Sequence, residues 1–275
     1  MVDLTELEQQ KHQKDLQRLR KLRPIDDDFM RCLFKDNIPL VELVLRIITG
    51  KSDLIITDCQ TQKDMKRLGG ARSICLDAYG TDTSGKKYDM EVQRSDRGSE
   101  PHRARYHSSV MDVENLDVGQ KFSELPDTYT IFIIEKDLYG MGEPVYPIER
   151  VNLLMGKPFE DGEHILYVNG EYRGDSDIGK LMHDFNCTDA SDMNFELMAE
   201  RTRYLKENPK GVNEMCKIIE DMRKEEREEG MREGMRTSAL RMLKAGKYAL
   251  EEIVNISGLP LDEVKRLQAK EDKVQ

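Results

Sequence analysis

The sequence lacks any long hydrophobic run, and this absence excludes a membrane-spanning protein. No segment of the 275 residues reaches the roughly 18 consecutive apolar residues that a bilayer-spanning helix needs. The amino terminus also lacks the apolar core of a signal peptide. We therefore expect a cytoplasmic protein without a membrane partner.

Cysteine is scarce, and its pattern argues against disulfides and structural zinc. The five cysteines are odd in number and form no Cys-x-x-Cys pair, so buried thiols are the favoured interpretation. His183 and Cys187 are four residues apart, which could provide half a metal site. Without two further ligands nearby in the sequence, helix packing and capping explain this pair better.

Net positive charge is also missing. The net charge of -10 argues against a protein that coats nucleic acid non-specifically, because lysine and arginine supply most of that affinity. A nucleic-acid partner would have to bind a local basic patch. The alternative for such a patch is an ordinary solvated helix face. The best candidate patch contains Arg94, Arg97, Arg103 and Arg105.

A polar hairpin over residues 76–93 is the most informative stretch that is present. Strand side chains alternate between faces, so Asp89, Glu91 and Gln93 share one face of the second strand. The turn around 83–85 lets the two strands pair antiparallel. Asp77 of the first strand and Glu91 of the second could then converge on one ion.

Two facing carboxylates oppose each other unless a cation lies between them. Mg²⁺ prefers oxygen ligands and is usually held by one or two carboxylates plus substrate phosphate. Asp77, Glu91 and the backbone carbonyl of Val92 would supply such a ligand set, with Mn²⁺ as a possible substitute for Mg²⁺. The alternative is a solvated strand face, where Lys86 or Lys87 offsets the acids.

A third acid could come from an apolar helix predicted over 38–49. Asn37 is suited to the N-cap and Gly50 to the C-terminal stop. Glu42 and Arg46 belong to the polar stripe of this helix, which must face either water or the active cleft. Their spacing also fits a simple i, i+4 ion pair.

The order of predicted elements indicates an α/β protein. The apolar stretch 128–134 is typical of a central strand covered on both sides. A strand, a helix and a strand in sequence favour parallel pairing through a right-handed crossover. The predicted elements are helices at 3–22, 38–49 and 101–115, and strands at 72–79, 87–94, 128–134 and 164–169.

We expect four segments along the chain. These are a charged N-terminal helix (1–22), a core (23–178), a charged helical extension (179–236) and a tail (237–275). The tail resembles a small helix-turn-helix with its turn at Gly258. Its second helix pairs Lys265 and Arg266 with acidic neighbours, so it fits an interaction or homo-oligomerisation role better than base readout.

Several sequence blocks resemble one nuclease group. An Asp on one strand followed by Glu-x-Lys or Glu-x-Gln on the next resembles the PD-(D/E)xK nuclease superfamily. More narrowly, the chain resembles the PD-(D/E)xK nuclease family transposases, related to the Rpn recombination-promoting nucleases. The resemblance rests on residues 22–27, 72–77, 88–93, 103–109, 125–133 and 181–185.

This resemblance implies a restriction-endonuclease-like mixed sheet flanked by helices, with a charged helical C-terminal extension. It also implies a Mg²⁺-dependent DNA endonuclease associated with recombination and mobile elements. Asp77 and Glu91 would hold the metal, and Glu42 would be the helix acid. Gln93 would orient water, and phosphate would be bound by Arg94, Arg103 or Arg105.

Two positions depart from the broader superfamily pattern. Leu76 stands where many members have Pro, and Gln93 stands where most have Lys. An amide can position water but carries no charge and cannot act as a base. Two alternatives to an active nuclease therefore remain: a decayed nuclease fold that binds DNA without cutting it, and an oligomeric interaction protein.

Overall fold

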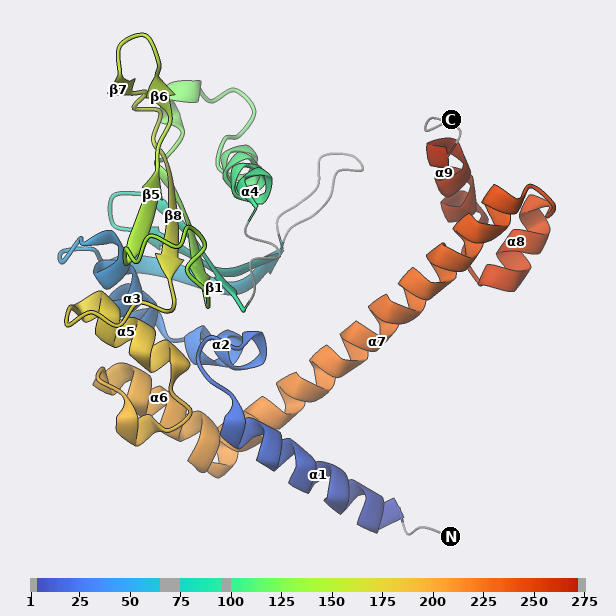
Figure 1. Cartoon of the computed structure of the whole chain (residues 1–275), viewed down its shortest axis with the longest axis horizontal. Coiled ribbons are helices and arrows are strands. Elements are labelled where there is room, and N and C mark those ends of the chain that lie inside the picture. Colours follow the sequence, from blue (N-terminus) through green and yellow to red (C-terminus); the bar gives the residue numbers. More distant parts are fainter. Residues whose placement is uncertain (1–3, 65–74, 95–99, 272–275) are drawn as a thin grey trace. The chain divides into compact units, whose positions relative to one another are not determined.

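A six-stranded mixed sheet lies at the centre of the first of two compact units (Figure 1). The computed structural model describes residues 4–64, 75–94 and 100–271. The strand order is β1-β2-β3-β4-β8-β5. The strands are β1 (Ile56–Asp64), β2 (Cys75–Asp82), β3 (Lys87–Gln93), β4 (Thr128–Ile134), β5 (Val145–Ile148) and β8 (Glu163–Asn169).

Pairing in the sheet changes direction at β3. Strands β1, β2 and β3 are antiparallel, whereas β3, β4 and β8 run parallel, and β5 returns antiparallel to β8. Every residue of β4 is buried, as its continuous apolar run predicts. The predicted mixed α/β architecture is confirmed. A small ribbon of β6 (Val151–Asn152) and β7 (Lys157–Pro158) extends from the loop between β5 and β8.

Helices cover both faces of the sheet (Figure 1). Helix α4 (Pro101–Glu114) joins β3 to β4 and packs on β4, while α2 (Asp27–Phe34) and α3 (Ile38–Thr49) contact the sheet from the other side. Helix α1 (Leu4–Lys21) precedes α2 in the chain. The helices that follow the last strand of the sheet are α5 (Asp177–Asn186), α6 (Glu196–Glu207) and the start of α7 (Pro209–Ala245). Short 3-10 turns are η1 (Phe122–Glu124) and η2 (Ala190–Asp192).

Helix α3 begins and ends where its sequence predicts. The Asn37 side chain accepts a hydrogen bond from the backbone N–H of Leu40, which caps the amino end. Gly50 ends the helix with φ at 69°, a left-handed conformation that glycine adopts without strain. The five buried side chains of the helix then face the sheet and α5.

Residues 1–216 and 217–275 form separate compact units. Helices α5 and α6 contact α3 and α2, so they belong to the first unit. The four-segment division expected from the sequence stays a prediction. None of the described helices is both long and apolar enough to cross a membrane.

The second unit contains the end of α7, α8 (Leu250–Ser257) and α9 (Leu261–Glu271). Gly258 makes the turn between α8 and α9 with φ at 74°. Ala239, Ile253, Leu259 and Val264 form its buried core. A helix-turn-helix-like role for this tail stays a prediction.

Candidate metal centre

Strands β2 and β3 bring Asp77 and Glu91 together. The antiparallel register pairs Ala78 with Met90 and Tyr79 with Asp89. Continued by one residue, this register places Asp77 opposite Glu91 and on the same face of the sheet. The backbone N–H of Asp77 donates to Glu91 Oε1 at 3.1 Å. In return, the backbone N–H of Val92 donates to Asp77 Oδ2 at 3.3 Å. The two carboxylates are therefore held side by side by the backbone of the strands that carry them.

The carboxylates on β3 are buried rather than solvated. Asp89 is 0% exposed and Glu91 is 1% exposed. Burial raises the pKa of Asp89 well above its usual value, and the charge of Asp77 raises it further. Burial likewise raises the pKa of Glu91, together with the charges of Asp89 and Asp77. The alternative of a solvated strand face is therefore wrong for these two acids.

Helix α4 places two basic side chains over these acids. Arg103 and His107 lie four residues apart, on one face of the helix. Arg103 Nη2 donates to Glu91 Oε2 at 3.0 Å, and Arg103 Nε donates to His107 Nε2 at 3.2 Å. His107 Nδ1 lies 2.9 Å from Asp89 Oδ2 and 4.0 Å from Glu91 Oε1.

These contacts define the protonation of His107. Its side chain is 1% exposed, and burial lowers its pKa. Because Arg103 donates to Nε2, that nitrogen must carry a lone pair, and the ring proton lies on Nδ1, facing Asp89. His107 is thus a neutral hydrogen-bond donor in this site.

The site gathers three acidic side chains, Asp77, Asp89 and Glu91. Arg103 is a cation that contacts Glu91 directly, and His107 contacts Asp89. The Oδ1 atom of Asp89 is buried without a hydrogen-bond partner, which is costly for a carboxylate. Ligand atoms of Asp89, Glu91 and His107 lie within 4.8 Å of one another. An orphaned oxygen within a set of buried carboxylates fits a hard divalent cation.

The family model of the PD-(D/E)XK nuclease family transposases matches residues 36–240. This range is most of the chain and includes the site. The chain belongs to this family. Its relation to the Rpn nucleases is consistent with that membership. No curated protein and no solved structure matches the chain. Membership of this nuclease family supports a nuclease-type function and a divalent metal.

The described contacts of Glu42 are with Ile56 and Arg46 and not with the acid cluster of Asp77, Asp89 and Glu91. Glu42 Oε2 accepts from the backbone N–H of Ile56 at 2.9 Å, and Oε1 pairs with Arg46 at 2.6 Å. The contact with Ile56 joins α3 to the start of β1, and the contact with Arg46 is the i, i+4 ion pair that the sequence offers as the alternative. A role for Glu42 as the helix acid of the reaction stays a prediction.

Gln93 lies at the end of β3, on the same face as Glu91 by strand alternation. Its backbone carbonyl accepts from the backbone N–H of Glu135, and the residue is half-buried. A water-orienting role for Gln93, and the Val92 carbonyl as a ligand, remain predictions.

The predicted phosphate-binding arginines separate in the structure. Arg103 contacts the acid cluster directly, whereas Arg94 pairs with Asp26 and Glu135 on the surface. Arg105 is exposed and lies about 200° around α4 from Arg103, because each helical residue turns by about 100°. Arg97 lies outside the described residues. Arg103 is therefore the arginine of this patch that the structure places at the acids.

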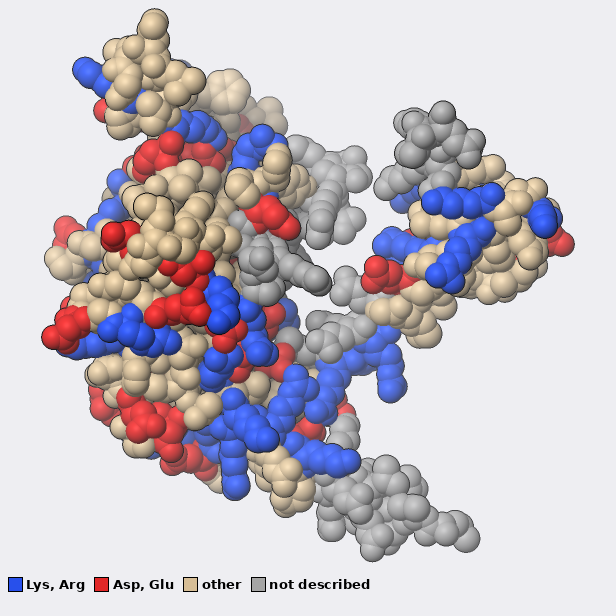
Figure 2. Space-filling view, in the orientation of Figure 1, with Lys and Arg blue, Asp and Glu red and all other residues tan. Residues whose placement is uncertain are grey.

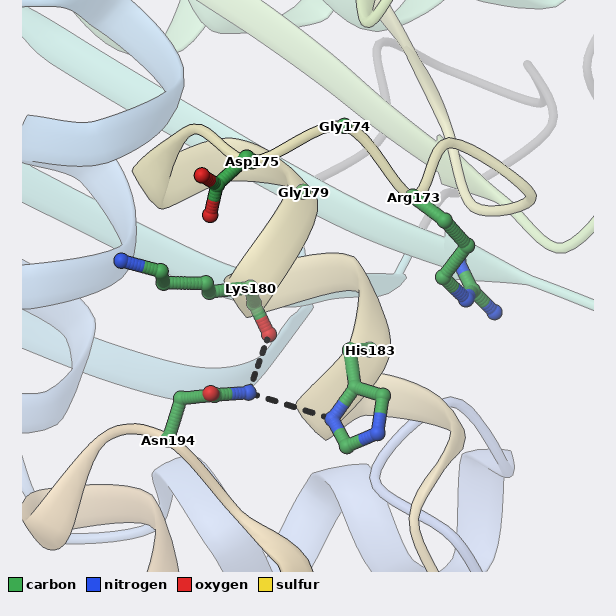
Figure 3. Close-up of a pocket in the computed structure, with 7 residues that line it drawn as sticks. All are labelled: Arg173, Gly174, Asp175, Gly179, Lys180, His183 and Asn194. Atoms are coloured by element: carbon green, nitrogen blue, oxygen red, sulfur yellow. Dashed lines mark hydrogen bonds between the residues drawn. The ribbon is translucent and has the colours of Figure 1, made fainter.

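A second cluster consists of His183, Asp184 and Cys187. Of these residues, His183 also lines a cavity of about 320 Å³ (Figure 3). The buried Asp184 accepts from the backbone N–H groups of Asn194 and Phe195 at 2.8 Å, so its oxygens already have donors. Burial raises the pKa of the Cys187 thiol to about 11, which disfavours a metal-binding thiolate. Figure 3 shows the Asn194 amide reaching both the Lys180 carbonyl and His183. These contacts agree with helix packing and capping.

The sequence interpretation did not select Asp89 and His107 as site residues. Asp89 carried a usable signal, since it alternates onto the same face as Glu91. His107 carried a weaker one, because it lies one helical turn after Arg103. The sequence could not show that α4 folds back over β3 and buries both.

Proposed function

We propose that this member of the nuclease family is a metal-dependent DNA endonuclease that hydrolyses phosphodiester bonds. The observation that carries the proposal is the pair of buried acids on β3, one of them with an orphaned oxygen, facing Asp77 on β2. Asp77 and Glu91 would hold Mg²⁺ or Mn²⁺, with the Val92 carbonyl as a further oxygen ligand. A cation bound there would lower the pKa of its water and offset charge on the phosphate.

Three other side chains would have separate roles in the reaction. The Gln93 amide can accept and donate hydrogen bonds, so it would orient the attacking water without taking its proton. Arg103 is 36% exposed at its side chain, so its guanidinium can meet a phosphate while it borders Glu91. Glu42 would assist metal binding only if its carboxylate leaves the ion pair with Arg46.

The net charge of -10 means that DNA must be attracted locally. Figure 2 shows Lys and Arg side chains gathered in patches among acidic ones on the face in view. We expect DNA binding to weaken steeply with salt, because phosphate contacts dominate it. A homo-oligomer formed through the C-terminal helices, and a cytoplasmic location, are further expectations of the same proposal.

Cleavage by the purified chain tests this function. Supercoiled plasmid is incubated with the protein in Mg²⁺, in Mn²⁺ and in EDTA, and nicked and linear products are measured. We expect products with either metal and none in EDTA. DNA binding without cleavage in both metals would instead support a decayed nuclease, for which Gln93 in place of Lys is the supporting feature. Absence of both binding and cleavage would favour an interaction protein.

A further inference from the structure

Only one of the two carboxylate oxygens of Asp89 has a hydrogen-bond partner. Its Oδ2 atom faces His107 Nδ1 at 2.9 Å, while its Oδ1 atom has no partner, although the side chain is fully buried. Such an atom loses its hydration without compensation, so its presence needs an explanation.

Asp82 shows what a purely structural buried aspartate looks like in the same hairpin. Its Oδ1 accepts from the Ser84 side chain and from two backbone N–H groups, and its Oδ2 accepts from the Tyr88 hydroxyl at 2.8 Å. Asp82 is 8% exposed, so both residues are buried. The hairpin can therefore satisfy a buried carboxylate fully, and it does not do so for Asp89.

The satisfied oxygen of Asp89 is fixed by a chain of hydrogen bonds from α4. Arg103 Nε donates to His107 Nε2, and His107 Nδ1 donates to Asp89 Oδ2. This chain sets the orientation of the carboxylate. The free oxygen lies on the face of the sheet that carries Asp77 and Glu91, since residues two apart on β3 share a face.

From this geometry we propose that Asp89 is a third carboxylate ligand of the divalent cation, through Oδ1, and that His107 is its positioning residue. The assignment rests on the proposed metal-dependent function. Hydrogen-bonded partners behind a ligand orient it and strengthen metal binding. His107 itself is not a ligand in this arrangement, because Arg103 occupies Nε2 and the proton on Nδ1 points at Asp89.

The test is calorimetric titration of Mn²⁺ into the full chain without DNA. We expect Asp89→Asn to weaken binding by about 10-fold or more, because a ligand oxygen and its charge are lost. The matched control is Asp82→Asn, which makes the same chemical change at the satisfied aspartate and should leave Mn²⁺ affinity unchanged.

Thermal unfolding in EDTA separates a ligand from a structural group. Asp89→Asn removes a like charge from the buried cluster, so its unfolding midpoint should equal or exceed that of the wild type. Asp82→Asn breaks satisfied hydrogen bonds and should unfold at a lower temperature. A destabilised Asp89→Asn that binds Mn²⁺ as tightly as the wild type would overturn the ligand assignment.

His107 is tested by a conservative pair of variants. His107→Leu should weaken Mn²⁺ binding by about 10- to 100-fold, as for other partners that orient a ligand. His107→Asn should recover part of that loss, because its amide can donate from near the position of Nδ1. Equal affinities for wild type and His107→Leu would contradict the positioning role. A wild type that binds no Mn²⁺ would instead refute the proposed metal-dependent function itself.

Discussion

Asp77→Asn and Glu91→Gln are each expected to lower plasmid cleavage in Mg²⁺ by about 10³-fold, the upper range for losing one group that stabilises transition-state charge. Both substitutions keep the size of the side chain and remove the charge that would hold the cation. Glu91 is 1% exposed, and its Oε1 accepts a hydrogen bond from the backbone N–H of Asp77 at 3.1 Å, so the two acids lie side by side. The measurement is the initial rate of conversion of supercoiled plasmid to nicked product.

Asp58→Asn is the matched control for these variants. Asp58 lies on β1, the strand next to β2, but its side chain is exposed and receives a hydrogen bond from Gln60. Surface substitutions usually change free energies by about 0.5 kcal/mol or less, so cleavage should stay within about twofold of wild type. Wild-type cleavage by both Asp77→Asn and Glu91→Gln would refute this site.

Arg103→Ala is expected to separate metal binding from cleavage. Cleavage should fall by about 10²-fold, because a cation positioned for the phosphate is removed. Affinity for Mn²⁺ in the absence of DNA should change less than cleavage, because removing Arg103 frees Glu91 Oε2, which it contacts at 3.0 Å, but also removes the donor to His107 Nε2. Plasmid cleavage and calorimetric titration of the same variant measure the two effects.

Two further substitutions sharpen this result. Arg103→Lys should restore cleavage only in part, because one ammonium cannot match the two separate hydrogen bonds that the guanidinium makes. Arg105→Ala should lose less activity than Arg103→Ala, since Arg105 lies on the far side of α4. Equal losses of cleavage activity for the two alanine variants would contradict a specific role of Arg103 at the site.

Strong local signals made much of the fold predictable. The apolar run of β4 matches its predicted boundaries at 128–134, and α3 matches 38–49 because a side-chain cap and a glycine mark its ends. Both elements depend on local chemistry that one stretch of sequence contains.

Strand β1 and helix α2 are among the elements that were missed, because their signals are weak, as are the short strands β5, β6 and β7. Strand β1 is a polar edge strand, Ile-Thr-Asp-Cys-Gln-Thr-Gln-Lys-Asp, without regular apolar alternation. It is recognisable only from its pairing with β2. Helix α2 has eight residues, too short for periodicity to distinguish it from a loop. The beginning of the predicted strand at 72–74 lies outside the described residues.

The candidate site was predictable in part. The pairing of Asp77 with Glu91 follows from strand alternation and a short turn, both local properties. The roles of Asp89 and His107 depend on α4 covering β3, which is a tertiary contact. Glu42 accepts a hydrogen bond from the backbone N–H of Ile56 at the start of β1, a tertiary contact that the sequence of its helix does not indicate. Its role as the helix acid stays a prediction.

The most direct test of the central claim is the thermal unfolding midpoint of the wild type and of the Asp77→Asn/Glu91→Gln double variant, each in EDTA and in saturating Mg²⁺ or Mn²⁺. If the buried acids bind a dication, metal at 100 times its dissociation constant adds about 2.7 kcal/mol of stability to the wild type. This corresponds to a rise of about 5 °C or more in a domain of this size. The double variant should show no such rise. Identical midpoints of the wild type with and without metal would contradict the account.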